Sequence, residues 1–285
     1  MATTFGSTGI QEIHEIPRRR PIERPIGWDG FKARYGITVI TIINVTIFFV
    51  LWEIVARMGV VSKLLLPPIS EVVKVTIEMA ESGELWKHLS FSAINFTLGF
   101  LIATVTGIPM GLMLGASKKL DIIIGPYIWA LFSTPRLALL PLITVALGFG
   151  VVSKVFLVFI GAFFIIVINT WAGVKTVDQN LIHAGKVFGA NRFQIFSKVI
   201  VPFTLPFIIV GLRLGVTRAL VVTVVAEMLA SSRGMGYVIV RAADAFNSAK
   251  LFSMILILVI VSMTLVTLLR KSEEWIAPWR EKSSV

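Results

Sequence analysis

Three arginines lie inside apolar runs that are long enough to cross a membrane: Arg136, Arg213 and Arg218. An arginine at the centre of a bilayer costs roughly 2.5–3.5 kcal/mol on insertion scales, so it usually faces a cavity, a partner or the lipid headgroups. Their chemistry predicts an electropositive path for a small anion. Arg218 follows Arg213 by about 140° of helix rotation, so the two cannot both face one narrow pore. We expect Arg218 to line the path.

Two of the three arginines also have a structural interpretation. Arg213 stands in the sequence GLRLG, where packing or anchoring of the helix is as well supported as a place on the path. Arg136 follows Thr134 and Pro135, and a proline frees backbone carbonyls that can accept its hydrogen bonds. Glu227 is a candidate counter-ion near the outer end of the same run as Arg218, but it points to the opposite helix face.

No arrangement for covalent or metal chemistry is present in the sequence. His14, His88 and His183 are far apart, and no H-E-x-x-H or G-x-S-x-G motif occurs. The phosphate-binding pattern G-x-x-x-x-G-K-[ST] is also missing, since the segments 148–154 and 173–176 have the wrong spacing. With 0 cysteines, disulfides and thiolate metal sites are excluded. We expect no catalytic residue, metal site or cofactor on this chain.

The elements that must position the arginines are membrane-spanning helices. The chain of 285 residues is 56% hydrophobic, with a mean hydropathy of +0.86. About 20 apolar residues cross the hydrocarbon core as a helix, and six runs qualify: 36–57, 91–115, 122–147, 153–173, 203–230 and 250–270. Because lipid offers no hydrogen bonds to the backbone, the fold class is all-α, with six transmembrane helices. Pro126, Pro135 and Pro141 are expected to kink the third run.

The net charge of +11 lies at the ends of the apolar runs, which excludes nucleic acid as a partner and indicates orientation signals. With the N-terminus in the cytosol, inner segments carry twice as many Lys and Arg as outer ones. This predicts cytosolic termini, a cytosolic tail with an interfacial segment at 1–35, a membrane domain at 36–270 and a cytosolic tail at 271–285. The outer segment contains a predicted amphipathic helix at 70–81.

The inner segment 174–202 carries its own helix signals. Asp178 is a predicted N-cap, and Gly189 is a predicted C-terminal stop because glycine adopts left-handed dihedrals without steric cost. Asn191 and Gln194 form a capping-box pattern that starts a second short helix at 192–200, which Pro202 is expected to end. Two short amphipathic helices joined at a glycine predict a docking surface.

This segment resembles the cytoplasmic coupling loop of ABC importer permeases, usually written E-A-A, three residues, G, about nine residues, an apolar residue, L and P. Ala184, Gly189 and Pro202 match this pattern, whereas His183 and Gly185 replace its glutamate and second alanine. Six further fragments resemble the nitrate, taurine and aliphatic-sulfonate branch in the same order: LPPISEVV (66–73), SGELWKHL (82–89), GIPMGLMLGASKKL (107–120), TPRLALLPLITVALGFG (134–150), GLRLGVTRA (211–219) and AEMLASSRGMGY (226–237).

The resemblance implies a type I importer permease in the bacterial cytoplasmic (inner) membrane, among membrane lipid. It implies two cytosolic ATPase subunits that carry ATP and Mg, and a periplasmic or extracellular solute-binding protein, for which helix 70–81 is either a contact surface or only a solvated face. One copy has too few helices to enclose a wide path, so we expect a homodimer. Residues implied in ATPase coupling are Ile182, His183, Ala184, Gly185, Phe188, Gly189, Phe193 and Pro202.

His183 cannot supply the negative charge of the glutamate that it replaces. We therefore expect the apolar residues Ile182, Phe188 and Phe193 to contribute most of the contact energy, because buried aromatic residues usually dominate interfaces.

The substrate and the mechanism have alternatives. Positive groups favour a sulfonate, nitrate or an aromatic carboxylate, but the same branch is similar to permeases for neutral vitamin precursors. A different class is an ion-coupled secondary transporter that acts without an ATPase. It would need paired intramembrane carboxylates, and the spans offer only Glu53 and Glu227, both near their ends. A non-transporting scaffold would have no use for intramembrane arginines.

Overall fold

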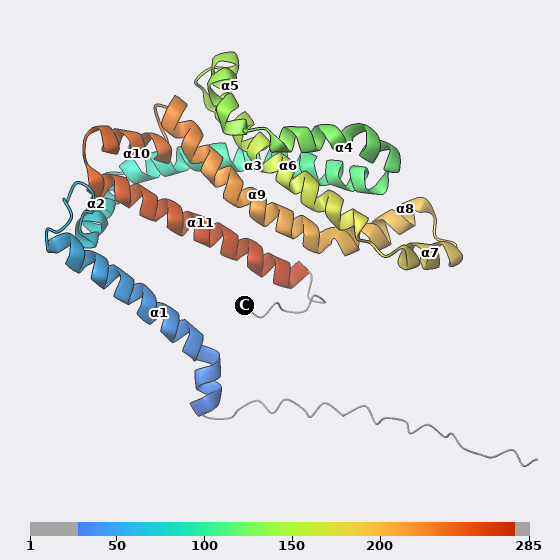
Figure 1. The fold of residues 1–285 in the computed structure, drawn as a ribbon, viewed down its shortest axis with the longest axis horizontal. Coiled ribbons are helices and arrows are strands. Elements are labelled where there is room, and N and C mark those ends of the chain that lie inside the picture. Colours follow the sequence, from blue (N-terminus) through green and yellow to red (C-terminus); the bar gives the residue numbers. More distant parts are fainter. Residues whose placement is uncertain (1–27, 277–285) are drawn as a thin grey trace, which may run out of the picture. The chain divides into compact units, whose positions relative to one another are not determined.

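The computed structural model describes residues 28–276, and every regular element in that range is helical (Figure 1). The chain divides into one unit that ends at Leu51 and a second that begins at Trp52. The first helix, α1 (Trp28–Arg57), crosses this boundary. Its apolar side chains from Val39 to Leu51 are largely exposed, as expected for a helix in contact with lipid.

The second unit contains the remaining elements. In chain order they are α2 (Ile69–Glu81), α3 (Glu84–Ala116), α4 (Lys118–Ser133), the 3₁₀ turn η1 (Arg136–Leu139), α5 (Leu140–Leu147), α6 (Val151–Lys175), α7 (Gln179–Val187), α8 (Arg192–Ile195), the π-helical segment η2 (Phe196–Ile200), α9 (Val201–Ala230), α10 (Met235–Asp244) and α11 (Ser248–Ile276). The predicted helix at 70–81 is confirmed as α2, one residue longer at its start.

Five stretches of the described chain are long and apolar enough to cross a membrane: Val39–Arg57, Glu84–Ala116, Val151–Lys175, Arg192–Ala230 and Ser248–Lys271. The predicted third span is a broken one, since Lys118–Ser133 and Arg136–Leu147 meet at 81°. The break falls at Thr134 and Pro135, where the sequence predicted a kink. Six crossings are reached when this bent pair counts as one.

Two predicted boundaries are wrong. The second span begins at Glu84 rather than at residue 91, and its first turn is held by an ion pair between Lys250 Nζ and Glu84 Oε1 at 2.7 Å. The predicted helix 192–200 does not end at Pro202, because α8, η2 and α9 continue without interruption. The wider π turn moves the preceding carbonyls away from the proline ring, which allows the helix to pass through it.

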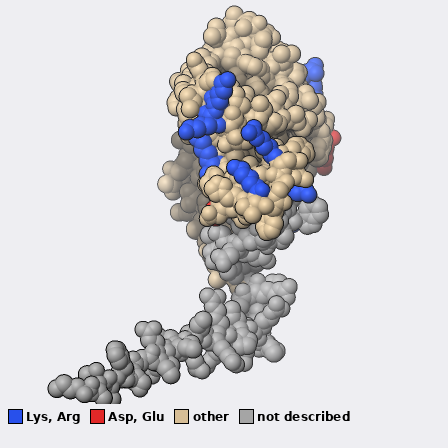
Figure 2. All heavy atoms as spheres, turned by 90° about the vertical axis from the view of Figure 1, so that its right-hand side faces the viewer, with Lys and Arg blue, Asp and Glu red and all other residues tan. Residues whose placement is uncertain are grey.

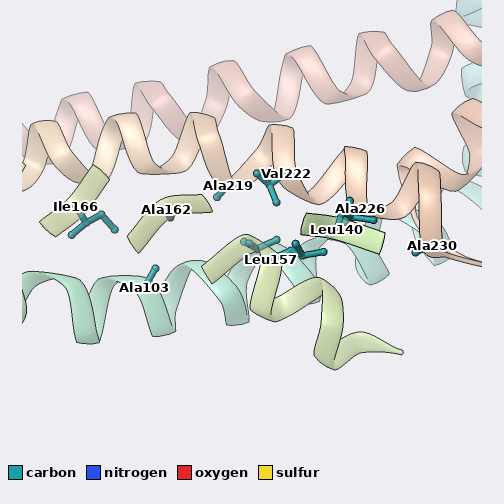
Figure 3. Close-up of a cluster of buried hydrophobic side chains, with 10 residues drawn as sticks. Ala103, Leu140, Leu157, Ala162, Ile166, Ala219, Val222, Ala226 and Ala230 are labelled. Atoms are coloured by element: carbon teal, nitrogen blue, oxygen red, sulfur yellow. The ribbon is translucent and has the colours of Figure 1, made fainter. Parts of the chain in front are cut away.

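The core lies where α6 packs along both α3 and α9 (Figure 3). One buried cluster fills this contact: Ala103, Leu140, Leu157, Val158, Ala162, Ile166, Ala219, Val222, Ala226 and Ala230. Along α3, small residues recur every four positions at Gly99, Ala103, Gly107, Gly111 and Gly115. Small residues at this spacing let two helices approach closely in lipid.

The glycines of this row leave no room for a side chain. A Cβ atom on Gly111 would lie 2.6 Å from Thr170 Cβ and 2.7 Å from the carbonyl oxygen of Val167. On Gly115 it would lie 2.3 Å from Val174 Cβ. The backbone of α3 therefore contacts α6 directly over several turns.

We expect Gly111→Ala to destabilise the fold by about 1–3 kcal/mol, the usual cost of overpacking a filled core. The thermal unfolding midpoint of the purified chain in detergent measures this. Gly150→Ala is the matched control, because nothing lies within 4 Å of a Cβ atom there. Equal midpoints for both variants would contradict the close contact.

Candidate functional site

A cavity of about 260 Å³ lies between the α4–α5 break, α6 and α9. Most of its wall is apolar, and two arginines are its charged members. The lining residues are Thr134, Pro135, Arg136, Leu137, Leu139, Ile143, Leu157, Ile160, Gly161, Arg218, Val221 and Val222. No carboxylate is among these residues, so the cavity has a positive charge balance.

Arg136 is held in place by its surroundings. Its Nη1 donates a hydrogen bond to the carbonyl oxygen of Ile160 at 3.2 Å, and its guanidinium lies over the rings of Phe132 and Phe164 at 5.3 and 5.6 Å. The expected carbonyl acceptor is therefore present, but it belongs to α6 rather than to the proline-broken helix. The aromatic faces offer further electrostatic stabilisation to the cation.

Arg218 lines the same cavity as Arg136, and the two guanidinium groups are close enough for their charges to interact. Arg213 is not among the lining residues, in agreement with the predicted rotation between it and Arg218. The structure thus brings two of the three candidate path residues together and places the third elsewhere on α9.

Glu227 does not line the cavity but is fully buried in a polar cluster that sequence reasoning missed. Its Oε2 accepts hydrogen bonds from Ser92 Oγ at 2.7 Å and from the backbone N–H of Gly236 at 3.2 Å. Its Oε1 accepts from Asn95 Nδ2 at 3.2 Å. The backbone N–H of Met235 donates to Ser92 Oγ at 2.9 Å. The carboxylate therefore fixes the start of α10 against α3 and α9.

Lys154 is the second fully buried ionisable side chain. Its Nζ turns back to donate hydrogen bonds to the carbonyls of Phe149 and Gly150, at 2.8 and 3.0 Å. The charge of Glu227 attracts it as well. Paired and hydrogen-bonded charges of this kind are tolerated inside proteins, whereas isolated ones are not.

The capping signals of the inner segment are all formed. Asp178 Oδ1 accepts from the N–H of Asn180 at 2.8 Å, which confirms the N-cap of α7. Gly189 has a φ of 76°, in the left-handed region where glycine is favoured. Asn191 and Gln194 bond reciprocally at 2.8 Å as a complete capping box at the start of α8. These bonds give the two short helices a defined geometry.

Large apolar side chains of α7 and α8 point away from the protein. Val187, Phe188 and Phe193 are 84, 89 and 76% exposed, while Ile195 of α8 is buried. We call Val187, Phe188 and Phe193 the exposed apolar patch; sequence reasoning missed Val187. Of the other predicted coupling residues, those that are exposed are His183, Ala184 and Gly189, and those that are partly exposed are Ile182, Gly185 and Pro202.

Basic side chains surround this region. Figure 2 looks toward α7 and α8 and shows several Lys and Arg side chains on that face, with acidic side chains at its margin. Among the side chains that the structure describes, those of residues 39–271, no group of three or more His, Cys, Asp or Glu is placed to hold a metal ion. The described residues therefore offer a cationic cavity and an exposed apolar patch.

Comparisons with known proteins agree with this geometry. Residues 107–282 match a family model described as "Binding-protein-dependent transport system inner membrane component". The chain is 34% identical over 266 residues to the putative aliphatic sulfonates transport permease protein SsuC of Bacillus subtilis, covering 93% of both chains. It is 31% identical to the taurine transport system permease protein TauC of Escherichia coli, covering 83% of this chain and 88% of the relative.

Two other matches bear on substrate and fold. The formylaminopyrimidine transport permease protein ThiX of Halalkalibacterium halodurans is 31% identical, covering 83% of this chain and 96% of the relative. Among solved structures, a chain of the MetNI methionine ABC transporter in an inward-facing conformation matches with a TM-score of 0.54. At 21% identity, over 68% of this chain and 93% of that chain, this likeness shows the fold alone.

Ser92→Ala is expected to lower the thermal unfolding midpoint, because it removes one of the three hydrogen bonds to Glu227 and leaves the N–H of Met235 without its partner. An unpaired buried polar group costs about 1–3 kcal/mol. Ser90→Ala is the matched control, since the exposed Ser90 hydroxyl donates only within its own helix, to the carbonyl of Lys87. Identical midpoints for the two variants would show that the cluster adds nothing to stability.

The predicted cytosolic position of 174–202 can be tested with a thiol. The chain has 0 cysteines, so Phe188→Cys supplies a single reactive site. We expect a membrane-impermeant maleimide to label it in inverted membrane vesicles and not in intact spheroplasts. The reverse pattern would overturn the orientation, and Phe246→Cys, in the exposed turn after α10, should label with the opposite sidedness.

Proposed function

The chain belongs to the family of binding-protein-dependent transport system inner membrane components, and from this membership we propose that it imports a small anion with energy from a separate ATPase. It is a multi-pass permease subunit of the inner membrane, and its family role is transport rather than catalysis. Two further points belong to the proposal: which residues contact the partners and what the substrate is.

The exposed apolar patch supports a role in ATPase coupling. Apolar side chains as exposed as Phe188 and Phe193 cost free energy in water, and binding of a partner protein removes that cost. The caps at Asp178 and Asn191 hold the patch in one shape before the partner binds. Two cytosolic ATPase subunits, carrying ATP and Mg, would dock at 174–202 of two copies of the chain. Together the two copies would enclose the path, to which a solute-binding protein delivers substrate from outside.

The residues that line the cavity support the proposal about the substrate. Two arginines with no carboxylate in the same lining favour an anion over a cation or a neutral solute. Two relatives are named for the transport of aliphatic sulfonates and of taurine, which agrees with a sulfonate as the substrate. Nitrate and aromatic carboxylates have the same charge and fit the same arginines. Arg136 and Arg218 are the proposed path residues, and Arg213 has no place in this cavity.

The relative named for formylaminopyrimidine gives a second candidate, a neutral heterocyclic substrate. The cavity favours it less, because an uncharged solute would leave both guanidinium charges uncompensated. An ion-coupled transporter is favoured less still. Glu227 is already engaged by Ser92, Asn95 and the N–H of Gly236, so it is not available as an ion site.

The proposed domain boundaries follow the charge pattern. The membrane domain is 36–270, with both termini in the cytosol. Most of the proposed tails, 1–27 and 277–285, lies outside the described residues.

Phe188→Ser is expected to abolish partner-dependent ATP hydrolysis, because it removes the most exposed aromatic side chain of the patch. The measurement is ATP hydrolysis by the chain reconstituted in liposomes with an ATPase subunit and a solute-binding protein that co-purify with it. Phe246→Ser is the control, as Phe246 is 72% exposed but lies after α10. Full activity of the Phe188→Ser variant would show that the ATPase contact lies elsewhere. Transport in the absence of any ATPase would contradict the importer proposal.

A further inference from the structure

The cavity between the α4–α5 break, α6 and α9 has two chemically different parts. One part contains the guanidinium groups of Arg136 and Arg218, and the other is a wall of aliphatic side chains that includes Leu157 and Val221. An inorganic anion would match only the first part. A zwitterion would bring an ammonium group for which the lining has no carboxylate, while an anion with an apolar tail matches both parts.

We propose that this cavity selects organic anions with a short apolar tail, with the head group between Arg136 and Arg218 and the tail against the aliphatic wall. The proposal rests on the proposed function, since it takes the cavity as part of the translocation path. It deepens that function by giving the permease a selectivity of its own, in addition to that of a solute-binding protein.

The state of the two guanidinium groups supports a head-group site. Arg136 is oriented by its bond to the Ile160 carbonyl, which uses only one of the five N–H donors of a guanidinium. Within residues 28–276, no hydrogen bond or ion pair engages Arg218. The like charges of the two groups repel one another. An anion between them would relieve this repulsion and gain charge-assisted hydrogen bonds from both.

The depth of Arg218 favours a solute over a lipid headgroup. At 1.5 Å per residue, its Cα lies about 18 Å from the end of α9 at Ala230 and about 25 Å from its start at Val201. Both distances exceed the reach of an arginine side chain, so its charge stays within the span. An anionic lipid headgroup at the membrane surface would not reach it.

The size of the cavity limits the tail. Its 260 Å³ is slightly below the roughly 300–1,000 Å³ of typical small-molecule sites. Val221 lines it, and its side chain is 49% exposed, so a larger side chain there would extend into the cavity rather than into the core. Position 221 is therefore a specificity-determining position for tail length.

The test measures ligand protection of a single thiol, with no partner protein. Leu139→Cys places the reporter in the lining of the full-length chain, in nanodiscs of phosphatidylcholine, and a water-soluble maleimide labels it. Hexanesulfonate is expected to slow labelling, whereas taurine and hexyltrimethylammonium at equal concentration should not. Arg218→Gln should weaken the protection by about 10-fold, the usual effect of losing one charged hydrogen-bond partner.

Two further variants distinguish recognition of the head group from recognition of the tail. Arg213→Gln, on the same helix but outside the lining, should keep full protection by hexanesulfonate. Val221→Trp should lose protection by hexanesulfonate while keeping that by methanesulfonate, whose tail is a single methyl group.

Several outcomes would overturn the proposal. Equal protection by hexyltrimethylammonium would show simple apolar partitioning, and protection by added phosphatidylglycerol alone would make a lipid the occupant. If Arg213→Gln and Arg218→Gln reduced protection by the same amount, the arginines would act through the general electrostatic field of the helix and would not form a binding site. The labelling test involves no ATPase. If it failed while Phe188→Ser still abolished ATP hydrolysis, the cavity proposal would be wrong and the importer function would remain supported.

Discussion

Along one face of α3, five small residues recur every four positions, and the backbone there is so close to α6 that one added methyl group would overlap it. In lipid no hydrophobic force drives helices together, so this close packing has to supply the attraction. Once α6 lies along α3, its other face receives α9, with Gly211 and Gly215 near Ile166. The 81° break before α5 then leaves the cavity between the bent pair, α6 and α9.

The structure uses its intramembrane charges in two different ways. Glu227 and Lys154 are fully buried and hydrogen-bonded, and they fix the ends of helices. Arg136 and Arg218 face a cavity instead, and within the described residues Arg136 makes one hydrogen bond to a carbonyl and packs over two phenylalanine rings. A buried charge whose hydrogen-bond partners are all present stabilises the fold, whereas a cation that lines a cavity can bind a ligand. This contrast indicates a structural role for the first pair and supports the proposed ligand site at the second.

Local features were predictable from the sequence because their causes are local. The cap at Asp178, the turn at Gly189 and helix α2 each depend on residues within a few positions. The rotation between Arg213 and Arg218 followed from helix geometry alone. The asparagines are less predictable: Asn95 donates a hydrogen bond to Glu227 on another helix, whereas the amide of Asn169 donates to the Ile165 carbonyl in its own helix.

Features that depend on distant residues were not predictable. The side-chain partners of Glu227 lie 135 and 132 positions away in the sequence, and no local pattern marks Ser92 as one of them. The passage of the helix through Pro202 depends on a π turn, which has no reliable sequence signal. The acceptor of Arg136 belongs to α6, so only packing reveals it.

The uninterrupted helix from Arg192 to Ala230 has a mechanical consequence. It connects the docking surface to the cavity as one stiff rod, with about 39 Å of helix between Arg192 and Arg218. A tilt of about 5° at the docking end would displace Arg218 by about 3 Å, comparable to the length of one hydrogen bond. A small rotation of a bound ATPase would therefore be amplified into the making or breaking of contacts at the arginines.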